Sequence, residues 1–292
     1  MANIKKNKKL KYSNTYLKSN KIFIELVKNY GLNKFLYTHQ DYFELNFETK
    51  NKKEILIIFN LQNIINKNYI YKVIIKNLIY FVNLKTNKYS YKFIFFKNSN
   101  NFKLEQTFIK IAKKITKKVY LGFIFDNLDS KKNQIYVTKN RNYSLKILSN
   151  IFMKNINFND EIKKSNIHKL SKIFVNNIAN TDFSIISLTN DYIFKKLKNN
   201  LNDNFLYNFF YIIENNLTLS SKLVCEPFFE KYKLFFKKDD GNTIKKDTRL
   251  MMEILTYSDK KNDLLDISNL YNQKFIYMHK LYNKLQINKI IY

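Results

Sequence analysis

Glycine, proline and tryptophan are almost missing from this chain of 292 residues, which has 3 Gly, 1 Pro and no Trp. Average usage would give about 12% Gly plus Pro. Phosphate-binding loops of the GxxxxGK[ST] and GxGxxG types need several glycines close together, so three glycines exclude them. An HExxH motif is also absent. Because codons for the missing residues need G or C, the depletion indicates a gene written under strong AT bias.

Cysteine and histidine are scarce as well. The single cysteine, Cys225, excludes an intramolecular disulfide and favours a compartment where disulfides are not used. His39, His168 and His279 stand alone, with no cysteine or carboxylate at ligand spacing. We therefore expect no metal site, no cofactor and no enzymatic activity.

Long hydrophobic runs are absent too. The longest uncharged run, Ile55–Asn66, contains four Asn or Gln residues and is too short to span a bilayer. The lysines near the N-terminus are not followed by the apolar run of a signal peptide, and the arginines of an imported transit peptide are lacking. We expect a soluble or assembly-bound protein without a transmembrane segment or an import signal.

Positive charge is the abundant feature: Lys plus Arg number 52 against 23 Asp plus Glu, a formal net charge of +29. A surplus of this size repels itself in a free monomer, so it favours a polyanionic partner. AT bias enriches lysine by itself, so codon bias stays open as an alternative source of the charge. The predicted RNA-binding residues are Lys5, Lys6, Lys8, Lys9, Lys11, Lys110, Lys113, Lys114, Lys117, Lys118, Arg141, Lys163, Lys164, Lys195, Lys196, Lys245 and Lys246.

The residue pattern predicts an α+β fold: an N-terminal mixed α/β half with an antiparallel hairpin, and a mainly helical C-terminal half. We expect a basic tail over 1–12, an α+β domain over 13–158 and a helical domain over 159–292. The central unit is a basic amphipathic helix followed by a buried strand within Lys103–Phe125, where a side chain at Gly122 would cost room. Further strands are expected at Tyr42–Phe47, Gln134–Lys139 and Glu230–Phe236, and a hairpin at Tyr71–Leu84 with Tyr89–Lys97.

Periodicity at 3.6 residues predicts the helices. The N-terminal half has Thr15–Tyr30, closed by Gly31, and Ser144–Met153, while Glu54–Ile65 is ambiguous between strand and helix. The C-terminal half has Glu161–Asn177, Tyr192–Asn199, Phe205–Asn215, Thr248–Tyr257 and Asp263–Leu285, the last with Leu264, Ile267, Leu270, Tyr271 and Phe275 on its apolar side.

Several tyrosines lie near the lysines and are candidates to stack on unpaired bases. They are Tyr12, Tyr16, Tyr89, Tyr91 and Tyr143. Lysine meets phosphate without reading bases, so the expected contact is salt-dependent binding of the nucleic-acid backbone.

Two resemblances follow from these residues. The stretch Tyr120–Asp129 is faintly similar to the helix motif of LAGLIDADG homing endonucleases, but only Asp126 matches an acidic position and no second copy appears. Over its full length, the Lys, Asn, Ile, Phe and Tyr usage resembles that of proteins encoded in AT-rich mitochondrial genomes of protists. That resemblance implies a ribosomal protein of the mitochondrial matrix.

The first expectation is therefore a structural constituent of the mitochondrial ribosome, slightly favouring the small subunit, that binds rRNA and neighbouring ribosomal proteins and takes no small-molecule substrate. The alternatives are a soluble accessory subunit of a respiratory complex or ATP synthase, and a LAGLIDADG-like nuclease. The sequence leaves the rRNA site and the protein neighbours open.

Overall fold

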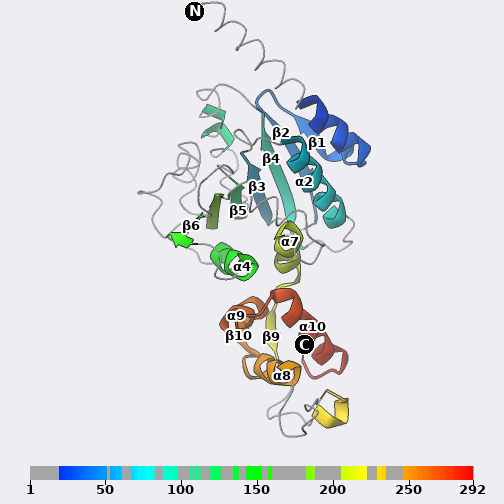
Figure 1. Ribbon diagram of the computed structural model, residues 1–292, viewed down its shortest axis with the longest axis vertical. Coiled ribbons are helices and arrows are strands. Elements are labelled where there is room, and N and C mark those ends of the chain that lie inside the picture. The colour runs from blue at the N-terminus through cyan, green and yellow to red at the C-terminus, as the bar shows by residue number, and fades with distance from the viewer. Residues whose placement is uncertain are drawn as a thin grey trace, which may run out of the picture. The chain divides into compact units, whose positions relative to one another are not determined.

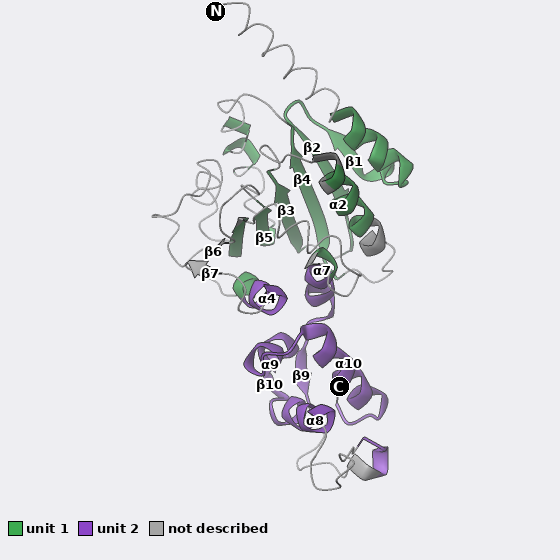
Figure 2. Cartoon of the chain, in the orientation of Figure 1, with its two compact units in different colours: residues 1–145, 156–207 green, residues 146–155, 208–292 purple. Residues whose placement is uncertain are grey.

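The computed structural model describes residues 20–50, 53–60, 67–82, 88–97, 106–107, 109–111, 113, 119–125, 134–137, 143–152, 157–159, 182–187, 205–221, 229–234 and 246–291. The chain divides into two compact units, one formed by residues 1–145 and 156–207, the other by 146–155 and 208–292 (Figure 2). The fold is α+β, as predicted: a mixed sheet with helices in the N-terminal half and a mainly helical C-terminal half. The predicted boundary at residue 158 and the predicted tail over 1–12 stay predictions.

Unit 1 is built on an eight-stranded sheet with strand order β1-β2-β4-β3-β5-β8-β6-β7. Figure 1 labels β1 to β6 of this sheet. The strands are β1 (Leu36–Thr38), β2 (Tyr42–Phe47), β3 (Glu54–Phe59), β4 (Ser90–Phe96), β5 (Val119–Phe125), β6 (Gln134–Val137), β7 (Asn157–Asn159) and β8 (Asp182–Ser187). Strands β4, β3, β5 and β8 run parallel, whereas β1 with β2, β2 with β4, and β6 with β8 are antiparallel. The predicted strand Tyr42–Phe47 is confirmed, and Glu54–Phe59 is a strand.

Phenylalanines hold one face of this sheet together. Phe59 stacks between Phe95 and Phe125, with ring centroids 4.9 and 5.0 Å away and interplanar angles of 13° and 12°. Phe23, from a helix over 20–29, contacts Phe95 at 4.9 Å, and its ring lies 4.9 Å from that of Tyr71. That helix and α2 (Lys67–Val82) therefore cover this face of the sheet (Figure 1). Each buried aromatic pair adds about 0.5–1.5 kcal/mol beyond its buried area.

The hairpin predicted at Tyr71–Leu84 is wrong, because residues 67–82 form α2. Tyr71, Ile74, Ile75 and Leu78 are all buried, which is the i, i+3, i+4, i+7 spacing of a helix face. Parallel β3 and β4 need such a crossover between them. The second predicted strand is confirmed as β4, and the antiparallel hairpin of this half is instead β1 with β2.

Gly31 and Gly122 behave as expected from the sequence. Gly31 ends the N-terminal helix with φ +70°, the left-handed conformation that glycine adopts at low cost. A Cβ at Gly122, in the middle of β5, would overlap the ring of Phe183 on neighbouring β8. The strand part of the predicted central unit is thus confirmed; its helix is described only at residues 106–107, 109–111 and 113, where Ile111 is buried.

Unit 2 contains most of α4 (Tyr143–Phe152) and α7 (Phe205–Asn215), then β9 (Thr218–Ser220), a 3-10 turn η4 (Phe229–Tyr232), α8 (Lys246–Thr256), β10 (Asp259–Asp263), α9 (Leu264–Leu270) and α10 (Phe275–Ile287). Helix α7 has the predicted bounds, and α4, α8 and β6 match predictions within two residues. The strand predicted at Glu230–Phe236 is wrong where the structure describes it, because η4 lies there and Lys233 has φ +54°.

Strand β8 was not predicted. The predicted helices Glu161–Asn177 and Tyr192–Asn199 lie outside the described residues. Within the described part of the chain, no helix is long and apolar enough to cross a membrane.

Candidate nucleic-acid interface

The segment predicted as one long helix, Asp263–Leu285, is two helices joined by a turn. Helix α9 ends at Leu270 and α10 begins at Phe275. Between them Asn272 has φ +50°, a conformation that asparagine tolerates better than most residues and that ends the first helix. Leu270, predicted on the apolar side, is instead 61% exposed, whereas Ile267 in the same turn of α9 is 1% exposed. The arrangement is a helix-turn-helix.

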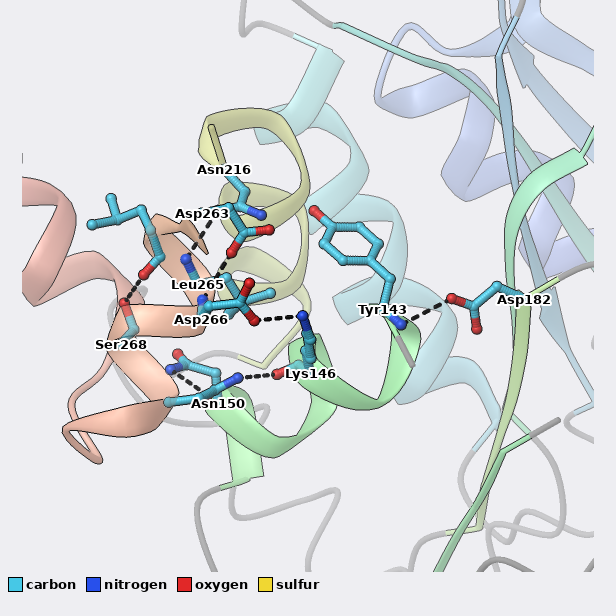
Figure 3. Close-up of polar contacts among 11 residues, drawn as sticks. Tyr143, Lys146, Asn150, Asp182, Asn216, Asp263, Leu265, Asp266 and Ser268 are labelled. Atoms are coloured by element: carbon cyan, nitrogen blue, oxygen red, sulfur yellow. Dashed lines mark hydrogen bonds and ion pairs between the residues drawn. The ribbon is translucent and has the colours of Figure 1, made fainter. Parts of the chain in front are cut away.

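Helix α9 begins at a double cap. The Asp263 carboxylate accepts a hydrogen bond from the backbone N–H of Asp266 at 2.8 Å, and the Asn216 side-chain oxygen accepts one from the N–H of Leu265 at 3.0 Å (Figure 3). Two of the N–H groups that a helix start leaves without an intrahelical partner are thereby satisfied. Burial raises the pKa of the Asp263 carboxyl, and its hydrogen bond to Asp266 opposes that shift.

Helix α10 has no side-chain cap of its own, since Lys274 at its N-cap makes none. Asn150, on α4, takes that place: its side-chain oxygen accepts from the N–H of Phe275 at 2.8 Å, and its amide donates to the carbonyl of Gln273 at 2.9 Å. The same amide donates to the Asn269 side-chain oxygen at 3.0 Å. Asn150 therefore fixes both ends of the turn between the two helices.

The inner face of α10 is packed with apolar and aromatic side chains. Phe275, Met278, Leu281 and Leu285 are each at most 1% exposed. His279 stacks on Phe275, with centroids 5.8 Å apart, and its Nδ1 lies 2.7 Å from the hydroxyl of Tyr211. This packing orients the opposite face of α10 outward.

The outer face of α10 is basic and polar. Lys280 and Lys284 are exposed one turn apart, Ile287 is 79% exposed, and Tyr277 and Asn283 are half-buried. Helix surfaces of this kind fit the major groove of a duplex, where lysines meet phosphates and asparagine pairs with a base edge. We call Tyr277, Lys280, Asn283, Lys284 and Ile287 the α10 face.

One carboxylate borders the α10 face. Asp247, in the first turn of α8, accepts a hydrogen bond from the Tyr277 hydroxyl and lies 3.7 Å from the Lys284 Nζ. Burial and this hydrogen bond raise the pKa of Tyr277 to about 12. Lys246 lies over the Tyr277 ring, 5.6 Å from its centroid. Asp247 thus offsets part of the positive charge of the α10 face.

Strands complete the framework of unit 2. β9 and β10 form an antiparallel pair, and Ser221 bridges Ile291 beyond the end of α10. The element order is strand, helix, strand, helix-turn-helix and a returning strand residue.

Charge is distributed unevenly along the chain. Residues 217–292 hold 14 Lys or Arg and 9 Asp or Glu, whereas residues 1–216 hold 38 and 14. Most of the surplus therefore lies outside the helix-turn-helix region.

Of the 17 predicted RNA-binding residues, the structure describes three. Lys110 and Lys113 are exposed in unit 1, and Lys246 is exposed in unit 2 beside Tyr277. The other fourteen lie outside the described residues, as does Asp126. The sequence pattern missed Lys280 and Lys284, which are single lysines rather than pairs. Tyr91, predicted as a stacking candidate, is fully buried in β4 and unavailable to a base.

Comparison with known protein sequences gives two findings. A winged helix-turn-helix family model matches residues 217–292, the region that contains β9 through α10. No protein with curated annotation has a sequence that matches the chain.

Solved structures resemble the fold. A candidate peptidase from Clostridium acetobutylicum is 18% identical, with a TM-score of 0.58 over 86% of this chain; the chain spans only 60% of that protein. Two Zn-dependent exopeptidases have lower TM-scores. The one from Parabacteroides distasonis is 10% identical, with a TM-score of 0.42 over 67% of this chain and 88% of that chain. A candidate one from Bacteroides vulgatus is 12% identical, with a TM-score of 0.41 over 67% of this chain and 83% of that chain. Among the residues that the structure describes, no group of three His, Cys, Asp or Glu could hold a metal ion.

Proposed function

We propose that the protein binds nucleic acid and that the α10 face is its recognition surface. The observation that carries the proposal is the helix-turn-helix itself: α9 and α10 joined by a turn that Asn150 fixes, with Lys280 and Lys284 exposed on the second helix. The match of the same region to a winged helix-turn-helix model supports it. In such motifs the second helix reads the major groove.

The finer proposal is that the lysines of residues 1–216, rather than the α10 face, bind ribosomal RNA, and that the protein is a structural constituent of a mitochondrial ribosome, more specifically of the small subunit. The surplus of lysine in residues 1–216 and the AT-driven composition support this proposal. Lysines spread over a folded body neutralise phosphate without choosing a sequence.

Sedimentation of native extract with and without RNase tests the ribosomal part. If the protein belongs to a ribosome, RNase shifts it from the ribosomal fractions to the top of the gradient. Co-sedimentation with membrane complexes that ignores RNase would instead support an accessory subunit of a respiratory complex or ATP synthase.

A binding panel tests the α10 face separately. The major groove of B-form DNA admits a helix, whereas that of A-form RNA is too narrow. Preference for duplex DNA that disappears in a Lys280→Gln/Lys284→Gln variant supports recognition by α10. Equal binding of every duplex, unchanged in that variant, would contradict it.

Hydrolysis of peptides is a second candidate function, and the fold likeness to the candidate peptidase from Clostridium acetobutylicum favours it. Fold alone is an analogy and does not assign a reaction. The test is release of a fluorophore from aminoacyl substrates, with and without added divalent metal ions. Turnover that co-purifies with the wild-type chain would support this function, and its absence from freshly purified protein would remove it.

A further inference from the structure

Two tyrosines in unit 1 stack where three neighbouring strands begin. Tyr89 directly precedes β4 and Tyr120 is the second residue of β5, with β3 between these strands. Their ring centroids lie 5.7 Å apart and the planes differ by 6°. Both side chains are half-buried, so each ring keeps part of its surface in solvent. The two rings thus stack on each other at the end of the sheet where β4, β3 and β5 begin.

A β-bulge positions Tyr120. Glu54 of β3 pairs with Val119, but the next residue, Ile55, pairs with Leu121, so Tyr120 is an extra residue in β5. A bulge of this kind re-aims a side chain and is over-represented next to functional sites. Leu121 and Tyr91 both pair with Ile55. Without the bulge, residue 120 would therefore point to the face of the sheet opposite to that of Tyr89 and Tyr91, because side chains alternate along a strand.

Lys53 contacts one of these rings, and Lys88 directly precedes Tyr89 in the chain. The Lys53 Nζ lies over the Tyr120 ring, 4.8 Å from its centroid, and the side chains of Lys53 and Lys88 are exposed. The backbone of Lys53 also holds the start of β4, because its carbonyl accepts from the N–H of Ser90 at 3.0 Å. Glu54, the acidic residue at the start of β3, is already paired with Lys92 at 3.4 Å. This end of the sheet therefore carries two aromatic rings and two exposed lysines.

We propose that Tyr89, Tyr120, Lys53 and Lys88, here called the tyrosine platform, bind an unpaired nucleotide of a single-stranded nucleic acid. The base takes the place of the Lys53 ammonium on the Tyr120 ring, and the displaced Lys53 and the neighbouring Lys88 meet the flanking phosphates. Stacking tolerates any base, since every base has a π-face, and positive grooves with aromatic rings are how proteins hold single strands. A neutral sugar would also stack on tyrosine but would gain nothing from the two lysines.

This site rests on the proposed binding of RNA by residues 1–216 and gives it a particular contact, and it needs neither α10 nor a duplex. The test uses the full-length chain, with fluorescence anisotropy of a short labelled oligouridylate and, in parallel, of a labelled duplex. We expect Tyr120→Ala to weaken single-strand binding by about tenfold or more, with duplex binding unchanged. Tyr120→Phe keeps the ring and should bind like the wild type.

Tyr37→Ala is the matched control, because Tyr37 is 53% exposed on β1 and lies outside the platform. Tyr89→Ala and Lys53→Gln, each made alone, repeat the test should Tyr120→Ala unfold. Equal single-strand affinity in the wild type, Tyr120→Ala and Tyr89→Ala would overturn the proposal, as would tighter binding of a neutral oligosaccharide than of oligouridylate.

The outcomes separate the two proposals. Duplex binding without single-strand binding removes the tyrosine platform and leaves the α10 face. Single-strand binding that depends on Tyr120, without duplex binding, supports the platform and removes the α10 face.

Discussion

The side-chain oxygen of Asn150 accepts a hydrogen bond from the backbone N–H of Phe275 at 2.8 Å, across 125 positions of sequence. Asn150 is 5% exposed and also donates to the Gln273 carbonyl. A residue far from the helix-turn-helix thus caps its second helix. We therefore expect the order of the α10 face to depend on this cap.

Replacement of Asn150 tests that dependence. Asn150→Ala leaves the buried Phe275 N–H and the partly buried Gln273 carbonyl without this partner, and a buried group left so costs about 1–3 kcal/mol. We expect unit 2 to lose about 2–4 kcal/mol of stability, measured as a lower denaturant midpoint, with faster amide exchange at Phe275. Asn46→Ala is the control, because Asn46 lies on β2 and its side chain makes an exposed hydrogen bond to Glu48. Unchanged exchange at Phe275 in Asn150→Ala would show that Asn150 does not hold the turn.

The Asp263 cap gives a second prediction. Asp263→Ala removes an N-cap acceptor from α9 and should lower the free energy of unfolding of unit 2 by about 0.5–2 kcal/mol. Asp263→Asn keeps an equally good cap and removes a charge that burial disfavours, so it should equal or exceed the wild type at pH 7. Because the pKa of Asp263 is raised in the folded state, the folded protein binds a proton at this carboxyl more tightly than the unfolded chain does. The ionised carboxylate therefore lowers the free energy of unfolding at neutral pH, and this loss disappears as the pH falls through the raised pKa. Denaturant unfolding at neutral and acidic pH measures both effects; an Asp263→Asn variant as unstable as Asp263→Ala would contradict them.

Asp247 is expected to weaken nucleic-acid binding. Its carboxylate holds the Tyr277 hydroxyl and the Lys284 ammonium on the α10 face, and it repels phosphate. Asp247→Asn keeps a hydrogen-bond acceptor for Tyr277 and removes the charge. We expect the affinity for duplex to rise severalfold at low salt, because the variant removes a negative charge from the border of a surface that meets negatively charged phosphates. Asp259→Asn removes a charge from exposed β10 and is the matched control; an equal gain in both variants would mean that only net charge matters.

Gly122 gives a stability prediction for unit 1. A Cβ there meets the Phe183 ring, which is 1% exposed and has little room to move. Gly122→Ala should destabilise unit 1 by about 1–3 kcal/mol. Phe183→Leu in the same chain should recover part of that stability, so the two changes will be non-additive. Thermal unfolding of the wild type, both single variants and the double variant measures these changes in stability. Strictly additive changes would show that the Phe183 ring does not obstruct a side chain at residue 122.

The sequence predicted the helices and strands best where apolar residues recurred with one clear spacing. Strand β2 alternates Phe43, Leu45 and Phe47 inward, and its bounds are confirmed. Helix α2 was mistaken for a strand because its isoleucines and aromatics favour strands locally, while packing on the sheet decides for a helix. Periodicity also continued across Asn272, since α9 and α10 both bury apolar residues, so the turn was missed.

The candidate sites depend on contacts that no local pattern reveals. Asn150 meets Phe275, and Tyr89 meets Tyr120, only once the chain has folded. Lysine pairs guided the predicted RNA-binding residues, whereas the lysines of the α10 face are spaced by a helical turn. The lysines of the α10 face point outward because the residues on the opposite face of α10 are buried.

The most direct test of the central claim is the salt dependence of duplex binding by the wild type and by Lys280→Gln/Lys284→Gln. Removing one lysine that neutralises a phosphate should lower the slope of log K against log[salt] by about 0.9. For the wild type we predict a steep slope between about 50 and 200 mM salt. For the double variant we predict a slope shallower by about 2. The control Lys231→Gln, at an exposed lysine outside the α10 face, should keep the wild-type slope. Identical slopes in all three proteins would contradict binding through the α10 face.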